Sequence, residues 1–142
     1  MDLKEMYREI VNEHNLHPTH KYDFENPTML KRGVNPSCGD DLTINLKIED
    51  GVIKDGSYVG NGCAISQASG DMMMDLIIGK TVDEAKHLAE IFNRMIKGKV
   101  TEEELEELED AQALIDISHM PARVKCALLS WRTLSEMLDE NN

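Results

Sequence analysis

Apolar and polar side chains alternate along residues 41–49, where every even position is Leu or Ile. This period of two is typical of a β-strand with one buried face. The dipeptide Asp50-Gly51 follows directly and favours a two-residue type I′ turn, because both turn residues need a positive φ. We therefore expect an antiparallel hairpin whose second, less regular strand runs from about Val52 to Asn61.

Most other apolar positions recur three or four residues apart, which predicts amphipathic helices. Two segments begin with a capping box, in which a threonine hydroxyl and a glutamate satisfy free backbone amides. Glycines end two of the helices, and a proline suits the first turn of the last one. The expected helices cover residues 2–13, the segment from Cys63 to Gly79, residues 81–97, the acidic segment from Thr101, and a last helix from Pro121.

Residues 14–26 contain Asn, Pro and Asp without a clear period and are expected to form a loop. Its histidines, His14, His17 and His20, are spaced by three residues, which is compatible with metal binding. We interpret them instead as exposed imidazoles on a loop. The three consecutive methionines 72–74 are interpreted as flexible core packing rather than as metal ligands.

The order of elements is one helix, a β-hairpin and then several helices. This order indicates the α+β class, with a small antiparallel β-sheet packed against several α-helices. The chain has 142 residues, of which 41% are hydrophobic and 30% charged, so we expect one globular domain over residues 1–142.

The net charge of −12 argues against nucleic acid as a partner, because binding to phosphates needs clustered Lys and Arg. Much of this charge lies in residues 101–110, which hold seven carboxylates and form either a solvated helix face or a docking surface for a basic partner. No apolar run approaches the roughly 20 residues of a membrane span. The first ten residues also lack a signal-peptide pattern, so we expect no membrane association and a cytoplasmic location.

Three cysteines and one aspartate form the candidate chemical site. If Glu49 pairs with Val52, the same register places Cys38 opposite Cys63, and a one-residue bulge still leaves both at one end of the hairpin. Asp40 lies two positions after Cys38, so an extended backbone directs both side chains to the same face. Pro and Gly flank Cys38, which predicts a mobile loop.

Cys126 supplies a fourth ligand if the last helix packs against the same end of the hairpin. Three sulfurs and one carboxylate oxygen suit tetrahedral Zn²⁺, whereas Mg²⁺ and Ca²⁺ prefer more oxygen ligands. An odd number of cysteines argues against a disulfide framework. The residues alone leave open whether the cysteines bind a metal or are buried thiols acting as small hydrophobes.

Three motifs in this order resemble the IscU/NifU N-terminal family of iron–sulfur cluster assembly proteins. The motifs are Asn-Pro-Ser-Cys-Gly-Asp at 35–40, Gly-Asn-Gly-Cys-Ala-Ile-Ser at 60–66 and Pro-Ala-Arg-Val-Lys-Cys-Ala-Leu-Leu-Ser-Trp at 121–131. The resemblance runs from about Met1 to Leu138. It implies an α+β fold in which the cysteines and the aspartate gather at one tip.

Two features resemble the SufU branch of that family. Lys125 stands where scaffold members have a histidine, and a helical insert occupies about residues 80–120. The resemblance implies a zinc-dependent sulfurtransferase that takes persulfide sulfur from a SufS-type cysteine desulfurase and relays it to downstream iron–sulfur assembly proteins. It also implies that a histidine of the desulfurase takes the position on zinc that the acceptor cysteine vacates.

On this hypothesis Cys38, Asp40, Cys63 and Cys126 hold the zinc ion, and Cys38 is the catalytic sulfur acceptor because its loop is mobile. Arg123 and Lys125 either help to meet the partner and balance the charge of the site or are ordinary solvated helix residues. The alternatives are a scaffold that assembles [2Fe–2S] clusters on the three cysteines and a structural zinc module that binds a partner without chemistry.

Overall fold

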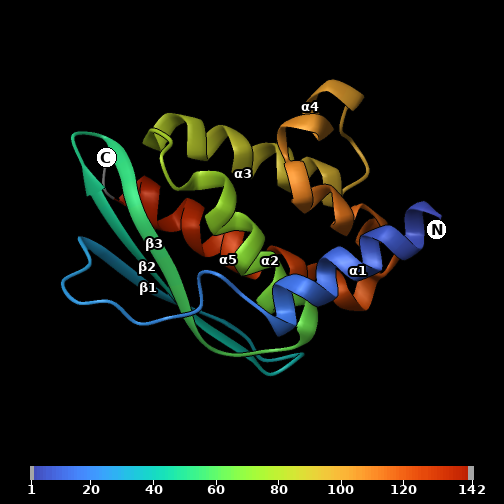
Figure 1. Ribbon diagram of the computed structural model, residues 1–142, viewed down its shortest axis with the longest axis horizontal. Helices are drawn as coiled ribbons and strands as arrows, with labels where there is room; N and C mark the ends of the chain where they lie inside the picture. The colour runs from blue at the N-terminus through green and yellow to red at the C-terminus, as the bar shows by residue number, and fades with distance from the viewer. Residues whose placement is uncertain (1, 141–142) are drawn as a thin grey trace.

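The computed structural model describes residues 2–140 and consists of one three-stranded antiparallel sheet with helices packed against it (Figure 1). The strands are β1 (Met29–Asn35), β2 (Asp40–Glu49) and β3 (Val52–Asn61), in the order β1-β2-β3. The helices are α1 (Leu3–Leu16), α2 (Ala64–Ile77), α3 (Val82–Ile96), α4 (Glu102–Glu107), the 3₁₀ helix η1 (Glu109–His119) and α5 (Pro121–Glu140). The predicted α+β class is confirmed. None of the helices within residues 2–140 has an apolar stretch long enough to cross a membrane.

The β2–β3 hairpin forms as predicted around Asp50 and Gly51, whose φ angles are 54° and 75°. Glu49 pairs with Val52, but a bulge between Lys47 and Ile48 shifts the register by one residue along the rest of the ladder. The ladder ends before it reaches either cysteine. Strand β1 was not expected from the sequence, and it makes the turn at residues 36–39 the connection between two strands. The last part of the expected helical insert is the 3₁₀ helix η1.

The core lies between the sheet and helices α2, α3 and α5. Leu42, Ile44 and Leu46 on β2 are at most 1% exposed, and the three methionines of α2 are equally buried, as predicted. The rings of Phe92 on α3 and Trp131 on α5 stack with their centroids 4.3 Å apart. This stacking packs α3 against α5.

The interpretation of three exposed loop histidines is wrong for two of them. Helix α1 continues to Leu16 and includes His14, whose Nδ1 lies 2.7 Å from Asp71 and whose Nε2 lies 3.0 Å from Asp110. The side chains of His14 and His20 are only 11% and 14% exposed. Their carboxylate partners lie more than fifty residues away in sequence, so local spacing gives no sign of this burial.

This arrangement predicts a pH-dependent contribution of His14 to stability. The hydrogen bond to Asp71 raises the pKa of His14 from 6.5 to about 9, against the lowering effect of partial burial and with further help from Asp110. A raised folded-state pKa gives a stabilisation that is complete below pH 6.5 and is lost as the pH rises through about 9. Urea unfolding in the presence of a chelator should show this loss, and His14→Gln should remove it. The exposed His87 provides the control, since His87→Gln should keep the native pH profile.

Candidate metal centre

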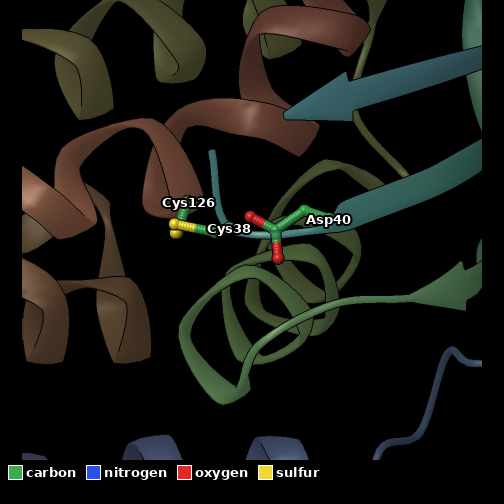
Figure 2. A group of neighbouring side chains, drawn as sticks. All are labelled: Cys38, Asp40 and Cys126. Atoms are coloured by element: carbon green, nitrogen blue, oxygen red, sulfur yellow. The ribbon is translucent and has the colours of Figure 1, made fainter. Parts of the chain in front are cut away.

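Three of the four expected ligands converge at one end of the sheet (Figure 2). Cys38 lies in the turn between β1 and β2, Asp40 is the first residue of β2, and Cys126 lies six residues into α5. One ligand atom from each residue lies within 4.8 Å of the other two. Asp40 and Cys126 are buried, whereas Cys38 is partly exposed.

Cys63 borders this group without belonging to it. It is the N-cap of α2, where its Sγ accepts a hydrogen bond from the backbone N–H of Ser66 at 3.4 Å. Its own backbone N–H donates to Asp40 Oδ1 at 2.8 Å. The structure therefore brings all four expected residues to the same end of the sheet, three as a tight group and Cys63 beside them.

The turn that presents Cys38 has a different geometry from the one expected. Asn35 and Asp40 form the last pair of the β1–β2 ladder, and the N–H of Cys38 donates to the carbonyl of Asn35 at 3.3 Å. Gly39 has a φ of 70°, a conformation that glycine adopts without strain. The prediction that Cys38 and Asp40 share one face of an extended strand is wrong, because a tight turn brings them together instead.

Asp40 is completely buried and yet remains ionised. Burial raises the pKa of this carboxyl, but hydrogen bonds from its neighbours outweigh that effect and hold the pKa below its usual range. The backbone N–H of Cys63 donates at 2.8 Å, the Ser66 hydroxyl at 3.0 Å and the Asn35 amide at 3.1 Å. A fixed negative charge therefore lies at the centre of the site.

The buried thiol of Cys126 resists ionisation in the absence of a metal ion. Burial raises the pKa of Cys126, and the neighbouring Cys38, Cys63 and Asp40 raise it further. The same thiols raise the pKa of the exposed Arg123 guanidinium. A divalent cation relieves the crowding of several anionic ligands, and soft sulfur with one carboxylate oxygen is a donor set that fits zinc.

Two further residues of the site were present in the sequence motifs but had been given no role. Ser66 donates to Asp40, and the buried amide nitrogen of Asn35 lies 3.1 Å from Asp40 Oδ2 and 3.7 Å from Cys126 Sγ. Asn35 thus contacts two expected ligands at once. Its contact with Cys126 spans 91 positions of sequence, and no local signal reveals it.

A comparison with known protein families shows to which family the chain belongs. The family described as "NifU-like N terminal domain" matches residues 6–129 of the chain. The chain belongs to this family. The resemblance seen in the sequence motifs is thereby confirmed, and the NifU-like domain includes all four expected ligands.

Individual relatives of this NifU-like domain have two kinds of name. The "Iron-sulfur cluster assembly scaffold protein IscU" of Thermotoga maritima is 40% identical over 97% of this chain and 96% of its own. The "Zinc-dependent sulfurtransferase SufU" of Bacillus subtilis is 34% identical over 95% of this chain and 90% of its own. A crystal structure of a putative SUF-system scaffold protein from Fervidobacterium islandicum has a TM-score of 0.87, with 34% identity over 96% of this chain and 99% of that one.

The contacts of Asn35 lead to a testable prediction for the NifU-like domain. Asn35→Ala removes a donor from Asp40 and from Cys126, so it should weaken zinc retention by about tenfold and lower the unfolding free energy by about 1–3 kcal/mol. Competition with a chromophoric chelator measures the first effect, and urea unfolding of the metal-free protein measures the second. The control is Asn45→Ala, a buried asparagine in the middle of β2, which should lower stability without changing zinc retention. Equal zinc retention by both variants would contradict a role for Asn35 at the site.

Proposed function

We propose that this NifU-like domain is a zinc-dependent sulfur acceptor in iron–sulfur cluster assembly, which takes sulfur from a SufS-type cysteine desulfurase onto Cys38. The observation that supports this role is the unequal surroundings of the sulfurs. Cys38 lies in a turn and is partly exposed, whereas Cys126 is buried within a helix. One thiol is therefore accessible to a partner while the other is fixed.

Cys38, Asp40, Cys63 and Cys126 would hold the zinc ion. When bound, zinc supplies one effect here, which is to keep the thiols in the thiolate form at neutral pH. Asp40 and Cys126 are fixed by burial and by the amide of Asn35, and the Cys63 sulfur accepts the N–H of Ser66. The Cys38 sulfur donates a hydrogen bond to the carbonyl of Ala122 at 3.7 Å. Cys38 thus differs from Asp40 and Cys126 in being partly exposed at the surface.

The transfer itself is a thiolate–persulfide exchange. The Cys38 thiolate attacks the outer sulfur of the persulfide on the desulfurase, and a new S–S bond forms at Cys38. The S–S bond of the donor breaks, and its electron pair leaves with the donor cysteine as a thiolate. Cys38 then holds a persulfide, with the proton of the donor group retained on the outer sulfur.

The second candidate is a scaffold on which [2Fe–2S] clusters are assembled. The name of the Thermotoga maritima relative favours it, and cysteine thiolates hold such clusters well. Lys125 argues against it, since it stands where scaffold members have a histidine and its side chain is exposed on α5. A protonated lysine does not replace an imidazole as a ligand.

Radiolabelled cysteine provides the test of the sulfur-acceptor role. We expect ³⁵S from labelled cysteine to appear on Cys38 when the desulfurase is present, and Cys38→Ser should abolish labelling while the two proteins still bind each other. Ser37→Ala, at an exposed neighbour in the same turn, is the matched control and should label normally. Label on Cys63 or Cys126 instead, or binding without any label, would show that Cys38 is not the acceptor.

Anaerobic reconstitution with iron and sulfide distinguishes the two candidates. A sulfur acceptor should lose any cluster rapidly, and Lys125→His should lengthen the lifetime of the cluster by supplying an imidazole next to Cys126. Visible absorption after desalting measures this lifetime. Arg132→His, at another exposed position of α5, should have no effect. A native protein that keeps a [2Fe–2S] cluster as long as Lys125→His does would favour the scaffold.

A further inference from the structure

A second group of ligating side chains lies between α1 and α2 and shares no residue with the cysteine centre. One atom each of His14, Asp71 and Asp75 lies within 4.8 Å of the other two. The side chain of Asp71 is 2% exposed and that of His14 is 11% exposed, whereas that of Asp75 is 45% exposed. The group is thus closed on the core side and open to solvent at Asp75.

We propose that His14, Asp71 and Asp75 bind a divalent first-row transition-metal ion of the Mn²⁺ or Fe²⁺ type. One imidazole nitrogen with two carboxylate oxygens is harder than the cysteine centre and suits these ions rather than a thiophilic one. The His14 Nδ1 lies 2.7 Å from Asp71 Oδ2 and 4.0 Å from Asp75 Oδ2. Ligand atoms about 2.1 Å from one ion lie roughly 3 Å apart, so small side-chain rotations suffice.

Outer hydrogen bonds orient each of the three donor atoms. Asp110 on η1 lies 3.0 Å from the other ring nitrogen of His14, which is the carboxylate–histidine arrangement common behind metal ligands. The backbone N–H of His20 donates to Asp71 Oδ1 at 2.8 Å, and the His20 ring lies 2.6 Å from Asp75 Oδ1. The second oxygen of each carboxylate remains directed towards His14 Nδ1.

The charge balance around this group favours a cation. Within residues 2–140, no Lys or Arg forms a salt bridge with Asp71, Asp75 or Asp110, whose ion-pair partners are His14 and His20. Three carboxylates therefore face two imidazoles in a chain whose net charge is −12. A buried carboxylate such as Asp71 requires a compensating charge. Protonated His14 supplies it in the metal-free protein, and a divalent ion supplies it when the ion displaces that proton.

Tyr58 packs against α2 beside Asp71 and carries a buried hydroxyl. Tyr58 is 0% exposed, and its hydroxyl has no hydrogen-bond partner among the described residues. A Cβ atom on Gly70, the neighbour of Asp71 in α2, would lie 3.5 Å from the Tyr58 ring, so this ring packs against α2 beside Asp71. Buried polar groups without a partner are rare.

Titration of the zinc-loaded, full-length protein with MnCl₂ tests the proposal, with free Mn²⁺ measured by electron paramagnetic resonance. Zinc first fills the cysteine centre, because thiolates prefer it to Mn²⁺. We expect one Mn²⁺ per chain, and both His14→Gln and Asp75→Asn should weaken its binding by at least about tenfold. His87→Gln is the matched control, since His87 is exposed and has one carboxylate partner. It should bind Mn²⁺ as the native protein does.

Three outcomes would overturn the proposal. They are no bound Mn²⁺ up to about 1 mM, equal binding by the native protein and both variants, and loss of the bound ion in Cys38→Ser but not in His14→Gln. The last would place the ion in the cysteine centre and leave the sulfur-acceptor role untouched. If His14→Gln proves unfolded by circular dichroism, Asp75→Asn decides the question, because Asp75 is half exposed and is not part of the core.

Discussion

The buried charge of Asp40 is the constraint on which the end of the sheet depends. A carboxylate removed from water costs several kcal/mol unless the protein replaces the lost hydrogen bonds. Here the replacements come from Asn35 at the end of β1 and from the first turn of α2. The same asparagine also contacts Cys126 on α5. The hydrogen bonds that stabilise the Asp40 carboxylate therefore connect two strands with two helices. They also position the sulfur atoms of the site.

Local signals predicted most of the fold, and β1 shows why they missed part of it. The β2–β3 hairpin and the capped helices follow from spacing and from turn residues, which act over a few positions. In β1 the usual pattern is reversed, since Leu30 is 62% exposed while Gly33 lies on the face covered by α5. A Cβ atom on Gly33 would lie 2.1 Å from the Thr133 hydroxyl. The glycine is required by a close approach of two elements that are a hundred residues apart.

The candidate site was predicted only in part, for a related reason. The sequence placed Cys38 and Asp40 together because they are neighbours, although the turn that joins them differs from the strand expected. The position of Cys126 depended on how α5 packs, which the sequence resemblance implied and the residues alone did not determine. The burial of His14 was missed because Asp71 and Asp110 are distant in the chain. Long-range contacts between polar groups produce no periodic pattern in the amino-acid sequence.

The stacked pair of Phe92 and Trp131 has a practical consequence. Trp131 is the only tryptophan of the chain, is 2% exposed and donates its indole N–H to Ser69 at 3.0 Å. It lies five residues after Cys126 on the same helix and contacts α2 and α3 at once. Its intrinsic fluorescence therefore reports, without an added dye, on the packing of α5 against α2 and α3. A ligand or partner that binds at the cysteines and displaces α5 would change this fluorescence.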